Sequence, residues 1–289
     1  MNDSNLNQNV QLILKDFCIE QILECGQCFR FYKLGEKDYI IIAKNRLLNV
    51  KQVEDQLNFY CSEEEFNNVW KDYFDLDRDY SEIKKKLADK DLFLREAVTQ
   101  KHGIRLLKQD PWEMLISFIL SQTKQIPHIK KLIEALSIQY GDFLAEYLGV
   151  KYYTFPTPNQ LMVATEEDLR ALKTGFRATY IVDAVKQIID GAIVLQELEA
   201  LQYDEAKIIL KSIKGVGDKI ADCVLLFAYS KYEVFPTDVW VKRIVEYYYF
   251  QQTISMDKIQ EFAKNYFGEY AGFAQQYLFY HARDNKLGK

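Results

Sequence analysis

The spacing of the apolar residues changes once along this chain, near Ser62, and this change limits the folds that the chain can adopt. Before Ser62, short runs with the alternating pattern of β-strands recur at 10–14, 29–33, 38–43 and 57–61. Residues 35–38 (Gly-Glu-Lys-Asp) have the composition of a hairpin turn between two of them. After Ser62 the apolar residues recur at helical spacing. We therefore expect an α+β fold: an N-terminal antiparallel β-sheet lobe followed by a mostly α-helical body.

The same change predicts two domains: an N-terminal domain with the sheet at 1–105, and a helical domain at 106–289 with two helical lobes around a cleft. Ser62 with Glu65, and Thr165 with Asp168, have the spacing of helix N-terminal capping boxes. Proline is tolerated at the first position of a helix but breaks a helix interior. Pro127 therefore predicts a helix that starts there, after a polar elbow at 121–126.

Residues 210–238, LKSIKGVGDKIADCVLLFAYSKYEVFPTD, read as a helix, a tight glycine hairpin and a second helix. Gly215 and Gly217, on either side of Val216, let the backbone take positive φ and bring N–H groups close to an anion. The following helix N-terminus adds a partial positive charge, so this turn predicts a phosphate site. A Gly-x-Gly turn alone is usually only a turn. Lys219 and Asp238 add a nucleophile and a carboxylate, which together favour chemistry on a nucleic acid.

The composition is that of an ordered globular protein, with 48% hydrophobic residues. A net charge of −5 disfavours general duplex binding, so a DNA-binding chain of this kind needs a local basic face. Lys84–Lys86 and Lys130-Lys131 could contribute to it, or be ordinary solvated helix faces. The polar start and the lack of a long apolar run predict no signal peptide and no membrane segment. We expect a cytoplasmic protein, associated with the nucleoid if it is bacterial.

The cysteines are odd in number and show no disulfide pattern, as expected in a reducing compartment: Cys18, Cys25, Cys28, Cys61 and Cys223. Cys25 and Cys28 have the spacing of a redox dithiol or of half a zinc site. We favour a third interpretation, reduced thiols in a strand region. Residues 29–31 continue as an alternating strand, and no second pair completes a zinc site.

The pattern from Leu210 to Asp238 resembles the helix-hairpin-helix DNA glycosylases. Over residues 10–285 the chain is similar to the 8-oxoguanine DNA glycosylases, as a bacterial member of that family. Four segments carry the match: GQCFRF at 26–31, QDPWEMLISFILS at 109–121, LRALKTGFRATYI at 169–181 and YAGFAQQYLF at 270–279. The resemblance implies that the partner is double-stranded DNA containing 8-oxoguanine, which is flipped out and excised with associated AP lyase activity.

For the chemistry, the resemblance implies that Lys219 attacks C1′ of the sugar and forms a Schiff base, which permits β-elimination. The amine must be uncharged to attack, and partial burial with a helix-terminus field favours that state. Asp238 is implied to stabilise the cationic sugar in the transition state. Its alternative role is the N-cap of the next helix, and one carboxylate can serve both purposes.

For the lesion pocket, the resemblance implies that the carbonyl of Gly26 accepts a bond from N7–H of the oxidised base, a hydrogen that guanine lacks. Gly26 could otherwise mark only a strand bulge. Phe279 and Cys223 are implied to lie on the two faces of the flipped base, and Gln275 to read its Watson–Crick edge. Trp240 stands near the catalytic aspartate, where the family has a histidine. Cys223 is i+4 from Lys219, so both lie on one side of the helix.

For the DNA itself, the hairpin residues Gly215, Val216 and Gly217 are implied to bind phosphate. The opposite-base contacts are implied at Thr123, His128, Arg170, Phe176 and Arg177. The two arginines match residues that contact the cytosine left behind. Phe176 keeps the ring of a tyrosine that wedges into the helix. Thr123 and His128 replace an asparagine and an arginine, which puts strict demand for cytosine opposite the lesion in doubt.

Several related glycosylases carry a four-cysteine iron–sulfur loop near the C-terminus, but residues 251–289 contain no cysteine. We expect no required cofactor, no iron–sulfur cluster, no metal held by side chains, and a monovalent cation or a phosphate at the hairpin backbone. A monomer is the simplest expectation. Three alternatives stay open: a glycosylase for alkylated or deaminated bases, a non-enzymatic DNA-binding module, and a thiol redox protein.

Overall fold

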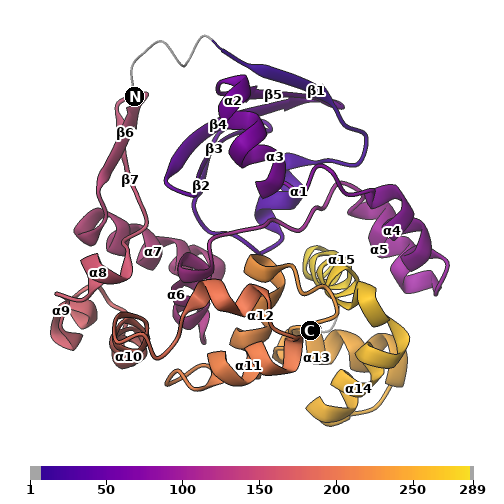
Figure 1. The fold of residues 1–289 in the computed structure, drawn as a ribbon. Coiled ribbons are helices and arrows are strands. Elements are labelled where there is room, and N and C mark those ends of the chain that lie inside the picture. The colour runs from indigo at the N-terminus through magenta and orange to yellow at the C-terminus, as the bar shows by residue number, and fades with distance from the viewer. Residues whose placement is uncertain (1–7, 287–289) are drawn as a thin grey trace.

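The computed structural model describes residues 8–286 and confirms the α+β fold class (Figure 1). Residues 1–7, which form most of the polar start discussed above, lie outside the described residues. A sheet lobe precedes a larger helical body that contains the helix–hairpin–helix unit.

The sheet has five antiparallel strands in the order β1-β5-β4-β3-β2. The strands are β1 (Val10–Ile13), β2 (Phe31–Gly35), β3 (Asp38–Ala43), β4 (Arg46–Val53) and β5 (Gln56–Tyr60). The predicted turn at 35–38 joins β2 to β3, where Gly35 pairs with Asp38. β4 was not predicted, because four consecutive residues of this strand, 47–50, are buried and its sequence does not alternate.

Both faces of the sheet are covered, which explains the missing alternation. One face packs against α1 (Ile19–Glu24), η2 (Phe66–Trp70) and α3 (Lys71–Tyr73), around a core that includes Phe59 and Trp70. The short α2 (Glu63–Glu65), which leads into η2, buries no side chain. Against the other face lies a hairpin of β6 (Phe143–Tyr147) and β7 (Val150–Tyr153), whose Tyr152 packs with Ile40 and Ile42. Neither this hairpin nor α1 was predicted from the sequence. With six residues, α1 is too short to show helical periodicity.

The helical body runs from residue 80 to residue 284. Its helices are α4 (Tyr80–Ala88), α5 (Leu92–Gln100), α6 (Pro111–Ser121), α7 (Ile126–Tyr140), α8 (Pro158–Leu161), α9 (Glu166–Ala171), α10 (Arg177–Ile189), η3 (Leu195–Glu199), α11 (Tyr203–Lys211), α12 (Asp218–Tyr229), α13 (Val239–Val245), η4 (Glu246–Phe250), α14 (Met256–Tyr266), η5 (Gly268–Tyr270) and α15 (Ala271–Asp284).

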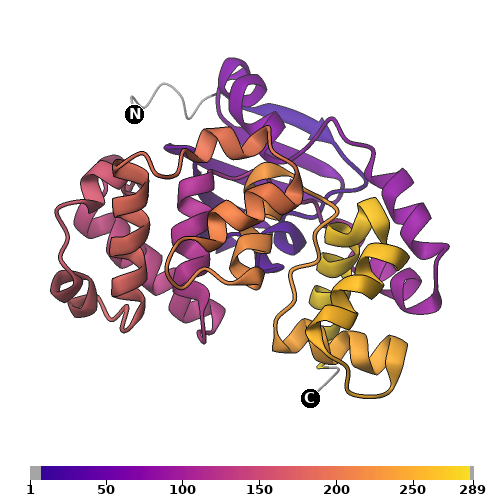
Figure 2. The same ribbon diagram turned by 60° about the horizontal axis from the view of Figure 1, so that its bottom comes forward.

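Helices α6 and α12 form the centre of this body and are buried on almost every side. They pack against each other, and the rings of Phe118 and Phe227 stack with centroids 5.6 Å apart. In Figure 2 the magenta-to-red helices of residues 111–189 lie on one side of the orange hairpin helices, and the yellow C-terminal helices lie on the other. The hairpin helices therefore lie between two groups of helices, and α12 packs against α6 of the first group.

Helix α15, near the C-terminus, packs against residues from the first part of the chain. It packs against α5, and the hydroxyl of Tyr277 donates to the carbonyl of Ile104 (3.3 Å). Lys101 and Asp284 form an ion pair across the same contact. Helices α4 and α5 thus share the core of the helical body although they precede residue 105. The domain boundary between residues 105 and 106 stays a prediction.

The predicted helix starts agree with the structure. Thr165 and Asp168 form a complete capping box, whereas Ser62 accepts from the Glu65 N–H and the Glu65 carboxylate bonds Trp70 instead. Pro127 lies in the first turn of α7, one residue after the helix begins. Within residues 8–286, no helix is both long and apolar enough to span a bilayer.

Candidate active site

The two glycines of the hairpin between α11 and α12 have different conformations. Gly215 has φ +81°, and a Cβ there would come within 2.2 Å of the Tyr180 ring on α10. Gly217 has φ −96°, so the expectation of positive φ at both positions is wrong for Gly217. A Cβ on Gly217 would meet nothing within 4 Å. Gly215 therefore permits tight packing on α10, and Gly217 leaves the α12 N-terminus open to a ligand.

Alanine substitutions should separate these two roles. Gly215→Ala is expected to lower the free energy of unfolding by about 2–4 kcal/mol, because it combines backbone strain with overpacking against Tyr180. Gly217→Ala is the matched control. Because Gly217 is the N-cap of α12, where glycine is preferred to alanine, we expect only a small loss of stability, of about 1 kcal/mol or less. Urea unfolding of both variants checks this. Equal destabilisation by the two substitutions would contradict the assignment.

Lys219 lies in the first turn of α12 and is half-buried. Its Nζ is 3.4 Å from the Ser121 hydroxyl and 5.1 Å from the centre of the Phe118 ring, both on α6. The side chain borders a cavity of about 630 Å³ that is also lined by Gln122, Gly215, Gly217 and Thr237, among others. Lys219 therefore borders an open space beside the hairpin, and its amine lies near one hydroxyl group and one aromatic ring.

Cys223, one turn further along α12, is buried beside this amine. Burial raises the pKa of its thiol to about 12, although the positive charge of Lys219 opposes the shift. The negative charge of Asp238 acts on the same thiol and raises its pKa. Lys219 and Asp238 are thus both close enough to Cys223 for their charges to act on its thiol.

Asp238 caps the N-terminus of α13, where its Oδ1 accepts from the Val241 N–H (2.8 Å). Within the described residues its second oxygen has no hydrogen bond, so it is available to a ligand. The preceding Thr237 is held by Gln260, whose Nε2 donates to the Thr237 hydroxyl (2.9 Å) and to the carbonyl of Phe235 (3.0 Å). The carboxylate therefore projects from a rigid turn.

The predicted lesion pocket brings residues from both ends of the chain together. A Cβ on Gly26 would lie 3.6 Å from Cε1 of Phe279 on α15. Gly26 has φ +91° and lies in the loop between α1 and β2, so the alternative of a strand bulge is wrong. One turn before Phe279, Gln275 is buried and its Oε1 has no hydrogen-bond partner. Trp240 is half-buried in the first turn of α13.

Of the residues predicted to face the opposite base, Thr123 lies in the elbow between α6 and α7, His128 lies in the first turn of α7, and Arg177 contacts the elbow. Thr123 and His128 are exposed, and Phe176 is 46% exposed. Arg170 is also exposed, and its guanidinium pairs with Glu166 (3.3 Å). Arg177 differs from the others because it is buried.

The buried guanidinium of Arg177 forms hydrogen bonds with the elbow. It donates to the carbonyl of Gln122 and to the Thr123 hydroxyl (2.8 Å). In this state of the protein Arg177 therefore positions the loop that carries Thr123. Its predicted contact with cytosine requires the guanidinium to exchange these partners for the base.

Cys25 and Cys28 lie in the loop before β2, not in a strand as expected. Burial raises the pKa of Cys25 to about 12 and that of Cys28 well above its ordinary value. A redox dithiol needs an accessible thiolate, so these neutral buried thiols do not support the redox alternative. In the part of the chain that the structure describes, no three His, Cys, Asp or Glu side chains are grouped to hold a metal ion.

Sequence reasoning missed several neighbours of the site. Ser121 and Phe118 approach Lys219 from about a hundred positions away, and Gln260 reaches Thr237 from α14. The buried Asp222 pairs with Lys207 (3.0 Å), which ties α12 to α11. Only Asp222 has a local signal, its i+3 spacing from Lys219; the other contacts depend on the tertiary fold.

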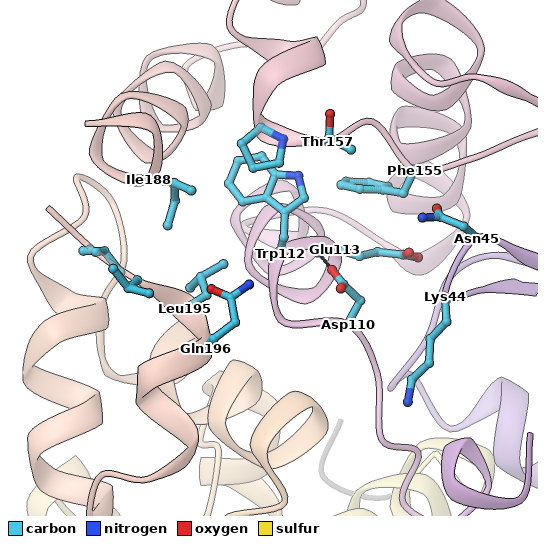
Figure 3. A pocket seen from close by; sticks show the side chains of 13 residues that line it. Lys44, Asn45, Asp110, Trp112, Glu113, Phe155, Thr157, Ile188, Leu195 and Gln196 are labelled. Carbon is cyan, nitrogen blue, oxygen red and sulfur yellow. Dashed lines mark hydrogen bonds between the residues drawn. The ribbon is translucent and has the colours of Figure 1, made fainter. Parts of the chain in front are cut away.

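A second cavity, of about 310 Å³, lies away from the hairpin between α6, the β3–β4 turn and the segment before η3. Figure 3 shows Trp112, Phe155 and Leu195 around the carboxyl groups of Asp110 and Glu113. Burial raises the pKa of Glu113 to about 7, and this outweighs the attraction of Arg30 at 3.9 Å. The carboxyl group is thus half-protonated near neutral pH.

This pKa predicts a pH-dependent stability. Between the ordinary value of 4.5 and about 7, Glu113 ionises in the unfolded chain but keeps its proton in the folded one. The free energy of unfolding should therefore fall as pH rises through this window, by up to about 3 kcal/mol. Urea unfolding at pH 5 and pH 8 should show a smaller fall for Glu113→Gln than for the wild type. Parallel losses in both proteins would contradict it.

Comparisons with known proteins agree with this arrangement. Residues 9–115 match the family described as 8-oxoguanine DNA glycosylase, N-terminal domain. Residues 116–268 match the HhH-GPD superfamily of base excision DNA repair proteins. The two matches together include the sheet lobe, the hairpin, Lys219 and Asp238.

Individual relatives agree as well. The probable N-glycosylase/DNA lyase of Methanothermobacter thermautotrophicus is 32% identical, over 74% of each chain. The N-glycosylase/DNA lyase of Saccharomyces cerevisiae is 29% identical over 91% of this chain and 83% of its own. The 8-oxoguanine glycosylase/lyase of Clostridium acetobutylicum, solved with double-stranded DNA containing cytosine opposite 8-oxoguanine, is 40% identical with a TM-score of 0.92, covering 98% of this chain and 100% of that one. This chain therefore belongs to the 8-oxoguanine DNA glycosylases of the HhH-GPD superfamily.

Proposed function

We infer that this chain is a bifunctional DNA glycosylase and AP lyase that excises 8-oxoguanine from duplex DNA. One observation supports the chemical assignment: the half-buried Lys219 borders the cavity beside Gly217, and its charge and that of Asp238 both act on the thiol of Cys223. A nucleophile and a carboxylate held by two helix N-termini suit attack on a sugar that becomes cationic. A module that only bound DNA would not need either group.

The reaction follows from this geometry. The Nζ lone pair of Lys219 forms a bond to C1′ while the glycosidic bond breaks, and its electron pair leaves with the base, which takes up a proton. Opening of the sugar ring gives a Schiff base, and loss of a C2′ proton then expels the 3′ phosphate. The free oxygen of Asp238 stabilises the positive charge that develops on the sugar. The neutral thiol of Cys223 adds no competing negative charge.

Lesion selection is assigned to the Gly26 carbonyl. The oxidised base carries a hydrogen at N7 that can bond this oxygen, whereas guanine presents a lone pair there. Losing one buried bond and meeting a repulsive acceptor costs guanine about 2–4 kcal/mol. The unpaired Oε1 of Gln275 is free to accept from the Watson–Crick edge of the base, and Phe279 provides a ring for stacking.

A set of duplexes that each contain one modified base tests the substrate. We expect rapid excision of 8-oxoguanine, and no excision of 3-methyladenine or uracil under the same single-turnover conditions. Undamaged guanine at the same position is the control. Faster release of an alkylated or deaminated base would instead favour the alternative glycosylase.

The base opposite the lesion should matter less than strict pairing with cytosine would require. Thr123 and His128 are exposed at the elbow but lack the amide and guanidinium implied there, which removes about one contact, or 1–3 kcal/mol of discrimination. We expect comparable excision of 8-oxoguanine opposite cytosine and opposite adenine. Single-turnover rates on the two duplexes check this, and a hundredfold preference for cytosine would contradict it.

No cofactor enters this chemistry, and we assign the open backbone at Gly217 to a DNA phosphate or a monovalent cation. Full activity in the presence of EDTA is the expected result. The remaining parts of the proposal are a monomer that acts in the cytoplasm, at the nucleoid if the protein is bacterial. Sedimentation of the protein alone and with DNA tests the first of them.

A further inference from the structure

The loop that carries Gly26 is held by one buried side chain, Gln27, which is fully inaccessible to solvent. Its Nε2 donates to the carbonyl of Ile22 (2.9 Å) and to that of Arg105 (2.8 Å), and it lies 3.3 Å from Sγ of Cys25. Its Oε1 accepts from the Leu107 N–H (2.8 Å). A single amide therefore joins the end of α1 to the segment that leads into α6.

Other side chains hold the same loop at its backbone. Gln109 donates from Nε2 to the carbonyl of Gln27 (2.8 Å). From α15, Arg283 donates to the carbonyl of Glu24 (2.5 Å), and Gln276 donates to Sγ of Cys25 (3.4 Å). The loop is thus fixed on the residues before and after Gly26.

The carbonyl of Gly26 itself is different. Within residues 8–286 it accepts no hydrogen bond, although the carbonyls of Glu24, two residues before it, and of Gln27, the next residue, both do. A carbonyl with free lone pairs between two anchored residues is suited to read a ligand donor, because the position of its oxygen is set before the ligand arrives.

We propose, building on the function inferred above, that Gln27 is a positioning residue for lesion recognition. It fixes the Gly26 carbonyl at the distance that N7–H of 8-oxoguanine requires, and it takes no part in sugar chemistry. Loss of the amide should therefore impair steps that depend on the base and spare steps that do not. An abasic site has no base to read, so cleavage of abasic DNA measures the sugar chemistry alone.

The test compares Gln27→Leu with Gln52→Leu. Gln52 is a matched control, because it is also a buried glutamine of the sheet lobe with three hydrogen bonds, to Ile19, Phe17 and Glu54. For Gln27→Leu we expect excision of 8-oxoguanine to fall about 10- to 100-fold, because a misplacement of about 1 Å in a positioned group can cost up to about 100-fold. Cleavage of an abasic duplex should stay at the wild-type rate. For Gln52→Leu the ratio of the two rates should equal that of the wild type.

The outcomes are distinguishable. Parallel losses of excision and abasic cleavage in Gln27→Leu would show a merely structural role and overturn the proposal. Unchanged excision in Gln27→Leu would also overturn it. So would a changed ratio of excision to abasic cleavage in Gln52→Leu. Failure of the wild type to excise 8-oxoguanine would instead overturn the proposed function. If Gln27→Leu does not fold, Gln109→Leu removes only the bond to the Gln27 carbonyl and should lower the same ratio to a smaller extent.

Discussion

Replacing Lys219 by glutamine is expected to abolish the covalent adduct that borohydride traps between this protein and a duplex with one 8-oxoguanine. Glutamine keeps the length and the polarity of the side chain but has no nucleophilic amine. Base excision should fall by at least about 10³-fold, as is usual when a nucleophile is removed. Trapping followed by gel electrophoresis, with single-turnover kinetics beside it, measures both effects.

Lys207→Arg is the matched control for this result. Lys207 also lines the cavity, but its amine is paired with the buried carboxylate of Asp222. Arginine preserves that ion pair and cannot form a Schiff base, so the variant should still be trapped. An adduct with Lys219→Gln, or its loss with Lys207→Arg, would place the nucleophile elsewhere.

Asp238→Asn should have the second largest effect, a fall of about 10²- to 10³-fold in excision, which is typical for loss of one charged transition-state contact. Asparagine is as good an N-cap as aspartate, so α13 and the stability of the fold should be preserved. Thermal unfolding together with single-turnover excision separates the two roles of this residue.

Asp238→Ala completes the comparison. Alanine removes both the charge and the bond to the Val241 N–H, so the variant should lose activity and also about 1 kcal/mol of stability. If Asp238→Asn remained fully active, the carboxylate would be a structural cap only. If both variants were equally unstable, the cap would depend on the charge.

The parts of the fold that could be predicted from the sequence are those with local causes. The glycine hairpin, the start of α7 near Pro127 and the complete capping box at Thr165 each depend on a few consecutive residues. Strand β4 was missed because burial on both faces removes the alternation that marks a strand. The β6–β7 hairpin, which covers one of those faces, left no signal that was recognised.

In the site, too, local features could be predicted from the sequence, whereas contacts between distant segments could not. The i+4 spacing of Lys219 and Cys223 placed them together correctly, since a helix fixes that geometry. The approach of Ser121 to the amine, and the enclosure of Arg177 beneath the elbow, depend on how α6, α10 and α12 pack. Such contacts join residues far apart in the chain, and periodicity within one segment contains no information about them.

The contact of α15 with the sheet-lobe loop has a consequence for how this protein matures on the ribosome. The bond from Gln276 to Cys25 joins positions 251 residues apart, and α5 packs against α15 as well as against α4. Closing such a long loop is slow, and the unfinished intermediate exposes apolar helix faces. In the nascent chain, the loop that carries Gly26 should therefore gain its contacts with α15 last. We expect chaperones to bind the partly synthesised protein until α15 emerges.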